Sequence, residues 1–251
     1  MFVAATTRCF ADLCLDAALQ RLVDLEFTCV EIMLHETGGH WKPSAVLADP
    51  EAAIRACRQT HRLTPVAISV DLDLPDSDPL YYQQFAACCK LAKALKIVTI
   101  TVRAAELGTP FNAEVERLRR LAAIASLDSS RIGLLTEVGR MTQDADTAVV
   151  LCQSVPEMGI TLDPSHYVYG APRTGNFEQI LKHVYHVRLR DTTKDHLQVR
   201  VGQGVIEYGK LIAQLGRFHY DRALCVDIAP LEDVDQAAEL RKMRLLLESL
   251  L

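Results

Sequence analysis

The chain has 251 residues, of which 49% are hydrophobic and 24% are charged, a composition typical of globular proteins. This length suits one large α/β domain or two small ones. The formal net charge of -5 gives no general attraction for a nucleic acid or for an anionic membrane surface, so we expect neither as a partner.

Short apolar, β-branched runs alternate with longer amphipathic runs from the beginning of the sequence to its end. The runs that predict strands are 2–6, 29–34, 65–70, 97–102, 132–138, 159–163, 185–191 and 223–228. The runs that predict helices are 15–26, 50–61, 81–96, 114–126, 147–155, 177–184, 208–218 and 236–251. Asp49 followed by Pro50 is a typical start of a helix.

This alternation of strand and helix, repeated eight times, predicts an α/β protein that folds as a single (β/α)8 TIM barrel over residues 1–251. A doubly wound sheet is the alternative, but the glycine-rich turn that would follow its first strand is absent. We find no linker rich in proline, glycine or serine that would divide the chain. In a barrel of this kind the active site lies at the C-terminal ends of the strands, so the functional residues are expected there.

The cysteines and the N-terminal segment indicate the compartment. The sequence MFVAATTRCF does not resemble a signal peptide, and no apolar run approaches the roughly 18 residues that cross a bilayer. The cysteines lack the CxxC spacing of zinc and redox sites, which predicts free thiols in a reducing compartment. We therefore expect a cytoplasmic protein. The cysteines are Cys9, Cys14, Cys29, Cys57, Cys88, Cys89, Cys152 and Cys225.

Charged and polar residues gather at the ends of the predicted strands. Several carboxylates that converge on a closed pocket cannot all stay ionised unless a positive group balances them. A divalent metal held by oxygen ligands and a histidine is the common solution. The strand-end residues are Glu31, His35, Asp71, Arg103, Glu137, Asp163, His166, Arg188, Asp191 and Asp227.

Four motifs, taken in order, resemble the xylose isomerase-like TIM-barrel superfamily. They are LLTEV, which contains Glu137, then DPSH at 163–166, HVRLRD at 186–191 and VGQG at 201–204. The resemblance covers essentially the whole chain. This superfamily groups sugar isomerases, ketose 3-epimerases, inosose dehydratases and endonuclease IV. We do not expect the chemistry of the endonuclease, because its three-zinc site needs more histidines than this chain offers and a surface suited to a polyanion.

The resemblance implies one divalent metal ion, Mn, Mg, Zn or Co, with Glu137 and Asp163 as retained ligands. Asp227 stands where the family has a glutamate ligand, and Arg188 stands where it has a histidine. An arginine keeps its proton and has no lone pair for a metal. Three arrangements stay open: a metal-free site in which the guanidinium takes the place of the cation, a metal held by the three carboxylates with water or His166, or a site without catalysis.

The resemblance also implies a sugar isomerase or epimerase that moves a proton next to a carbonyl through an enediolate. Glu137 and Asp227 are then the candidates for proton transfer, and His166, Arg188 and Lys194 are candidates for substrate binding. A keto-sugar lyase or dehydratase would use the same groups. A barrel that binds a carbohydrate or a protein without catalysis is the alternative, because Arg188 and Asp227 alter the ligand set itself.

The segment HETGGHW follows the second predicted strand and contains His35, His40 and Trp41. It predicts either a lid with an aromatic wall for a sugar ring or a solvated loop. We include His35 among the residues that would bind substrate. Barrels of this kind commonly pair, so the expected partners are a small carbohydrate and a second copy of the chain.

Overall fold

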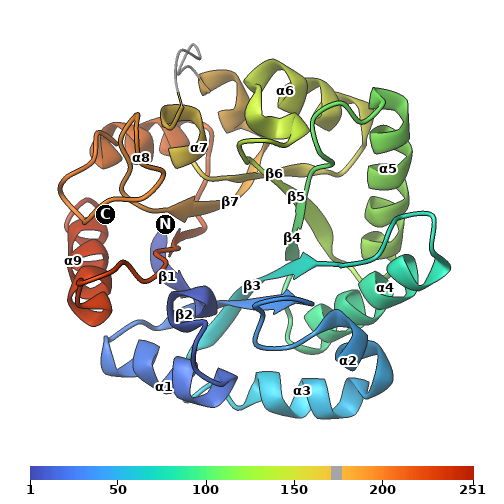
Figure 1. The fold of residues 1–251 in the computed structure, drawn as a ribbon, viewed down its shortest axis with the longest axis horizontal. Coiled ribbons are helices and arrows are strands. Elements are labelled where there is room, and N and C mark those ends of the chain that lie inside the picture. Colours follow the sequence, from blue (N-terminus) through green and yellow to red (C-terminus); the bar gives the residue numbers. More distant parts are fainter. Residues whose placement is uncertain (171–176) are drawn as a thin grey trace.

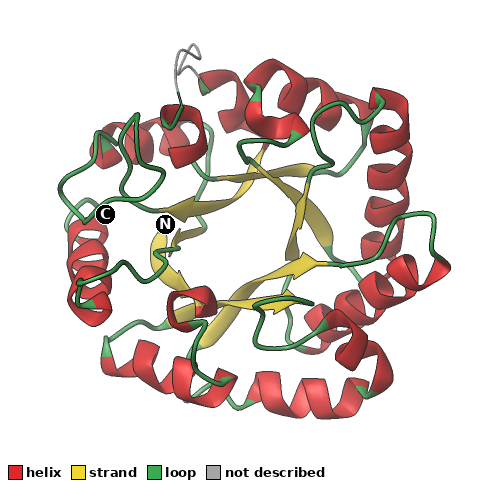
Figure 2. Cartoon of the chain, in the orientation of Figure 1, coloured by secondary structure: helices red, strands yellow, loops and turns green. Residues whose placement is uncertain are grey.

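In the computed structural model, eight parallel strands close into one barrel in chain order, and helices surround it (Figure 1). The structure describes residues 1–170 and 177–251. The closed barrel and its helical ring, which Figure 2 shows in separate colours, confirm the predicted (β/α)8 fold. The strands are β1 (Phe2–Thr6), β2 (Cys29–His35), β3 (Thr64–Asp71), β4 (Thr99–Arg103), β5 (Arg131–Leu135), β6 (Gly159–Leu162), β7 (Val184–Leu189) and β8 (Ala223–Val226).

The helices follow the strands and cover the outside of the barrel. Their apolar sides pack on the outward side chains of the strands, and together these residues form the main hydrophobic core. The α-helices are α1 (Leu15–Asp24), α2 (Pro43–Ala48), α3 (Pro50–Arg58), α4 (Pro79–Ala94), α5 (Phe111–Leu127), α6 (Ala145–Ser154), α7 (Ser165–Val168), α8 (Tyr208–Arg217) and α9 (Gln236–Glu248). The 3-10 helices are η1 (Thr7–Phe10), η2 (Met141–Gln143) and η3 (Glu178–His183).

The side chains inside the barrel are polar near the C-terminal ends of the strands and small near the N-terminal ends, which we call the base. Ala4, Ala223 and Cys225 form a separate buried cluster inside the barrel. Bulky branched side chains usually fill this space in such barrels. The small residues therefore leave room for long polar side chains such as Arg188, which lies opposite Cys225 in the register of β7 and β8.

Several predicted elements differ from the observed ones at their ends. Strands β5, β6 and β8 stop before the polar residues that the sequence patterns had included in them. At the end of β5, the Thr136 hydroxyl accepts from the Asp163 backbone N–H at 2.8 Å and donates to its carbonyl at 3.1 Å. A side chain thus replaces the ladder between β5 and β6 at this point. Helix α2 was not predicted, and the predicted helix at 177–184 is the 3-10 helix η3.

All eight cysteines are free thiols, as the sequence predicts. Burial raises the pKa of the Cys57 thiol to about 12. Such buried thiols behave as small apolar side chains. Among the described residues, no helix combines the length and the apolar character that crossing a membrane requires.

Candidate active site

Two of the predicted site carboxylates meet at the C-terminal ends of the strands. Asp163 follows β6 and Asp227 follows β8, and both are fully buried. Arg190, which follows β7, lies between them. Its Nη2 donates to Asp163 Oδ2 at 2.7 Å and to Asp227 Oδ2 at 2.9 Å. A guanidinium therefore balances the two carboxylates at the point where they converge.

Asp227 accepts further hydrogen bonds from the beginning of the chain. Arg8, in η1, donates from Nε to Oδ1 at 2.8 Å and from Nη2 to Oδ2 at 2.7 Å, and Thr6 Oγ1 donates to Oδ1 at 2.9 Å. Burial alone would raise the pKa of the Asp227 carboxyl, but Arg8, Arg190 and Arg188 outweigh it and hold that pKa well below its usual range. Asp227 is therefore ionised and fully engaged.

Arg188 points into the barrel, one layer below Arg190. It makes a two-point contact with Glu31 of β2: Nε donates to Oε2 at 3.1 Å, and Nη2 donates to Oε1. His186 lies a further layer down, with Nε2 at 2.9 Å from Glu31 Oε2. Burial would raise the pKa of Glu31, but Arg188 and His186 hold it well below its usual range. A strand thus carries an arginine toward its own core because a buried glutamate faces it.

We call the six residues that these contacts link the mouth cluster: Arg8, Glu31, Asp163, Arg188, Arg190 and Asp227. Arg188 reaches this cluster through Nη1, which is 4.0 Å from Asp227 Oδ2. The arrangement resembles the open possibility in which a guanidinium takes the place of the cation, but Arg190 rather than Arg188 bridges the carboxylates. The sequence carried a signal for Arg190: residues two apart on a strand point the same way, so Arg190 shares the inward face of Arg188.

Glu137 lies beside the mouth cluster, on the segment after β5. The Thr142 hydroxyl holds this segment by donating to the Leu135 carbonyl at 2.7 Å and accepting from the Glu137 N–H at 3.2 Å. Arg103, at the end of β4, donates to both carboxylate oxygens, from Nε at 2.9 Å and from Nη2 at 2.6 Å. Burial would raise the pKa of Glu137, but Arg103 outweighs it and lowers the pKa. The side chain keeps 19% exposure, so Glu137 is ionised and accessible.

His166 lies between Glu137 and the mouth cluster. Its Nδ1 accepts from the Val138 N–H at 3.1 Å, which assigns the proton of a neutral ring to Nε2. Nε2 lies 3.7 Å from Asp163 Oδ2. Burial, which outweighs the neighbouring Asp163, lowers the pKa of His166. The ring is therefore neutral near pH 7 and presents an N–H donor.

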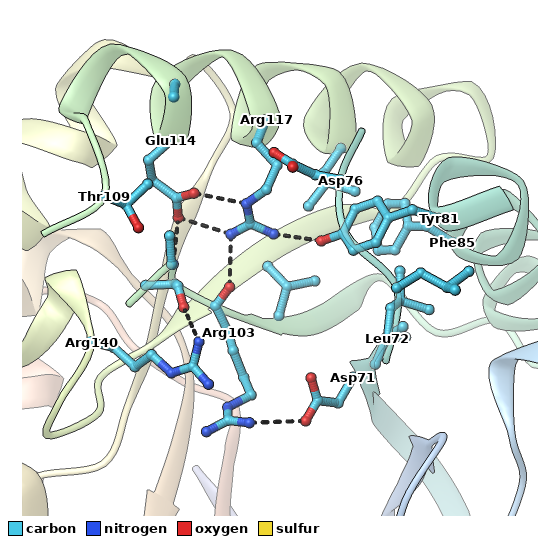
Figure 3. Close-up of a pocket in the computed structure, with 17 residues that line it drawn as sticks. Asp71, Leu72, Asp76, Tyr81, Phe85, Arg103, Thr109, Glu114, Arg117 and Arg140 are labelled. Carbon is cyan, nitrogen blue, oxygen red and sulfur yellow. Dashed lines mark hydrogen bonds and ion pairs between the residues drawn. The ribbon is translucent and has the colours of Figure 1, made fainter. Parts of the chain in front are cut away.

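A side pocket of about 270 Å³ opens next to Arg103, between the ends of β3 and β4 and helices α4 and α5. Figure 3 shows Arg103 on its wall, donating from Nη1 to Asp71 Oδ2 at 3.1 Å. Arg117 lies deeper and is saturated by Glu114, Tyr81 and the Arg103 carbonyl. The side pocket thus shares Arg103 with the Glu137 site.

The remaining predicted site residues lie in different surroundings. His35, at the end of β2, lies with Nε2 3.0 Å from Ser69 Oγ, and burial lowers its pKa to about 4 despite the nearby Asp71. Lys194 is exposed on the loop after β7, where its carbonyl accepts from the Gly170 N–H. Trp41 packs against the hydrophobic core and is half-buried, so the choice between a lid and a solvated loop stays a prediction.

Asp191, the last residue of HVRLRD, shapes a loop rather than the mouth cluster. Its Oδ2 accepts from the Gly202 N–H at 2.7 Å and from the Gly204 N–H at 3.0 Å. A Cβ on Gly204 would lie 1.9 Å from Asp191 Oδ1, and Gly202 has a φ of 90°. Both glycines are therefore needed for the tight turn at this point of the chain.

The donor set does not fit the divalent metal that the motifs imply. Both oxygens of Glu137 accept from Arg103, and both oxygens of Asp227 accept from arginines. Asp163 Oδ1 accepts from the Ser165 N–H at 3.0 Å and from its hydroxyl, and Oδ2 accepts from Arg190. A metal between these carboxylates would compete with guanidinium groups for the same lone pairs and would repel them.

Another set of possible ligand atoms lies deeper in the barrel. Glu31, His186 and Cys225 are buried, and one ligand atom from each lies within 4.8 Å of the others. Arg188 already neutralises Glu31 here, and burial raises the pKa of Cys225 well above its usual value, so the thiol keeps its proton. A metal would need the thiolate. This group therefore fits a metal no better than the carboxylates above it.

Comparisons with known proteins agree with the fold. A family model described as a xylose isomerase-like TIM barrel matches residues 19–244. No curated protein matches the sequence significantly. Similar solved structures include a D-tagatose 3-epimerase-like protein (16% identity, 99% of both chains covered, TM-score 0.74) and a 3-keto-D-glucoside 4-epimerase from E. coli (15%, 99% of both, 0.75). A third is a xylose isomerase-like protein from Mycobacterium smegmatis in complex with magnesium (14%, 99% of this chain and 97% of that one, 0.77).

Proposed function

Because the chain belongs to the xylose isomerase-like TIM-barrel family, we propose that it binds a small carbohydrate at the barrel mouth and isomerises it without a metal ion. The family and the sugar epimerases among similar structures support a carbohydrate ligand. One observation carries the mechanism: Arg190 bridges Asp163 and Asp227 where the motifs imply a cation.

In this proposal guanidinium groups balance the negative charge that develops on the enediolate during the reaction. Removing a proton next to a carbonyl leaves an enediolate, whose oxygen needs a positive partner. Arg8 is the member of the mouth cluster that is open to a ligand, with a side chain that is 33% exposed. Asp227 holds it by two hydrogen bonds. Arg8 would bind the carbonyl oxygen, and the Nε2–H of His166 would donate to a neighbouring hydroxyl.

Glu137 would carry the proton. As a carboxylate it takes a proton from the carbon next to the carbonyl and returns it to the former carbonyl carbon, while the hydroxyl proton moves to the other oxygen. One carboxylate suffices for this transfer. Epimerisation at one carbon needs a second group on the opposite face. Asp227, the other candidate, is fully buried and bound by Arg8 and Arg190, so the geometry favours an isomerase over an epimerase.

A second candidate function is carbohydrate binding without turnover. The two-point contact of Arg103 with Glu137 favours it, because an ion pair that lowers the pKa of a carboxyl also makes it a weaker base. Isomerisation therefore requires that Arg103 shifts toward Asp71 or toward the ligand when the sugar binds.

Proton exchange separates these functions. We expect that incubation with aldoses and ketoses in D2O places deuterium next to the carbonyl, as NMR measures, and that EDTA leaves the rate unchanged. Glu137→Gln should abolish this exchange, while the control Glu116→Gln, at an exposed acid on α5, should retain it. Exchange that survives in Glu137→Gln would remove this residue from the mechanism. Sugar binding without any exchange would support the second candidate.

Metal analysis tests the guanidinium centre. We expect well under one equivalent of Mn, Mg, Zn or Co per purified chain. Arg188→His restores the histidine that the motifs imply, but it should not raise metal affinity while Arg190 bridges the carboxylates. The double variant Arg188→His with Arg190→Ala should raise it. Stoichiometric metal in the unaltered protein would overturn the metal-free proposal.

Two further expectations belong with this proposal. The eight free thiols support a reducing compartment such as the cytoplasm. A homodimer stays a prediction, which light scattering during gel filtration would measure.

A further inference from the structure

A second pocket lies at the opposite end of the barrel from the mouth cluster. It has a volume of about 350 Å³, and its lining comes from the first residues of β1, β3, β4, β5, β7 and β8 and from the segments that precede them. We call it the basal pocket. It is lined by Phe2, Pro65, Val66, Lys96, Val98, Thr99, Arg131, Tyr185, His186, Arg222 and Ala223.

The charge of the basal pocket has one sign. Lys96, Arg131 and Arg222 line it together, and no acidic residue does so within residues 1–170 and 177–251. None of the three makes an ion pair with another described residue through its side chain. The acid Asp221, which directly precedes Arg222 in the sequence, does not line the pocket.

The arginines are held close together in this pocket. The Arg131 guanidinium stacks over the Tyr185 ring, 4.3 Å from its centroid, and its buried Nε has no hydrogen-bond partner in the part of the chain that the structure describes. Burial first, and then the neighbouring Arg131, lower the pKa of Arg222. Two like charges therefore line one concave space.

We propose that the basal pocket binds a small molecule through a phosphate group. Arginines match phosphate oxygens with paired N–H donors, and Lys96 adds a third positive charge. The rim supplies apolar contact for the rest of the molecule, because Phe2 is 40% exposed and Val98 is 46% exposed. The pocket is concave and of small-molecule size, which favours a metabolite over an acidic protein surface.

The floor of the basal pocket connects to the interior of the barrel. His186 lines the pocket and lies with Nε2 2.9 Å from Glu31 Oε2, and Glu31 in turn holds Arg188 of the mouth cluster. The ligand would therefore bind at the opposite end of the barrel from the proposed isomerase site, with His186 and Glu31 between the two. Variants at the two sites can therefore be tested separately.

Calorimetric titration at low ionic strength tests this site, with inorganic phosphate, ribose 5-phosphate and uncharged ribose as probes. We expect phosphate and ribose 5-phosphate to bind, with ribose 5-phosphate tighter because its carbon skeleton reaches the rim. Arg131→Gln and Arg222→Gln should each weaken ribose 5-phosphate binding by about tenfold. Raising the salt concentration should weaken binding in the unaltered protein.

Two controls locate the ligand. Arg217→Gln removes an exposed arginine on α8 and should leave the affinity for ribose 5-phosphate unchanged. Glu137→Gln alters the proposed active site and should leave the binding of inorganic phosphate, which is not a carbohydrate, unchanged, so a failure of the proposed isomerase would not affect this result. Ribose 5-phosphate binding that ignores Arg131→Gln and Arg222→Gln in folded variants, or no binding of either phosphate at millimolar concentration, would overturn the proposal. Circular dichroism establishes folding.

Discussion

The two ends of the barrel use arginine in opposite ways. At the mouth, Arg188 and Arg190 are buried and each faces a buried carboxylate. At the base, Arg131 and Arg222 share a pocket without an acid among its described lining residues. Residue type alone does not distinguish these roles. The difference teaches that the partners decide whether an arginine completes the scaffold or stays available to a ligand.

Removing Arg190 should produce the largest effect and should expose this difference most clearly. Arg190→Met leaves Asp163 and Asp227 buried without their shared partner, so we expect a loss of about 3–5 kcal/mol in the free energy of unfolding. Urea denaturation measures it. The matched change Arg131→Met at the base loses only the stacking on Tyr185 and should cost about 1 kcal/mol or less. Equal losses of stability in the two variants would contradict the proposed difference between the two ends of the barrel.

Acid should lower the free energy of unfolding through the carboxylates of the mouth, because no acid is among the described lining residues of the basal pocket. The folded-state pKa values of Asp227 and Glu31 lie below their unfolded values, so their contribution to stability is complete above about pH 4 and is lost as the pH falls. Each carboxylate should remove up to about 1.4 kcal/mol per pH unit below that point. Urea denaturation at several pH values tests this. Asp227→Asn should show a shallower slope, and an unchanged slope would contradict the assignment.

The fold was predictable because it depends on patterns that repeat along the chain. The alternation of strand and helix predicted the barrel, and β1 begins and ends where its pattern does. Helix α2 was missed because its six residues are too few to show a helical period. The predicted ends of β5 and β6 were too long because side chains such as Thr136 replace the ladder there, and periodicity does not contain that information.

The location of the candidate site could be predicted from the sequence, but the ion pairs within it could not. Strand-end position alone identified Glu137, Asp163 and Asp227. The motifs drew attention to Arg188, but contacts between distant segments decide which arginine meets which acid. Arg8 pairs with Asp227 across 219 positions of the sequence, and no local pattern encodes that pair. The alternation of side chains along a strand could have identified Arg190, but Arg190 was not singled out from the sequence.

Replacing the guanidinium of Arg8 by an amine should lower the free energy of unfolding by an intermediate amount. Arg8→Lys keeps the charge but loses the fork that donates to both oxygens of Asp227. Because the Arg8 side chain is partly exposed, water replaces part of the lost contact, and we expect a loss of about 1 kcal/mol. Thermal and urea unfolding measure it. A loss as large as that of Arg190→Met would mean that Arg8 balances the charge of Asp227 at least as much as Arg190 does.

A substitution in the basal pocket should change the free energy of unfolding least. Whether it raises or lowers that free energy is the informative result. Arg222→Gln removes a charge whose pKa is lowered by burial and by Arg131, and no described acid loses an ion pair. We expect the free energy of unfolding in buffer without phosphate to stay within about 0.5 kcal/mol or to rise. The same variant should lose the stabilisation that ribose 5-phosphate gives the unaltered protein, because only the folded state presents the pocket. A clear loss of stability without ligand would show that Arg222 is part of the scaffold, as Arg188 and Arg190 are.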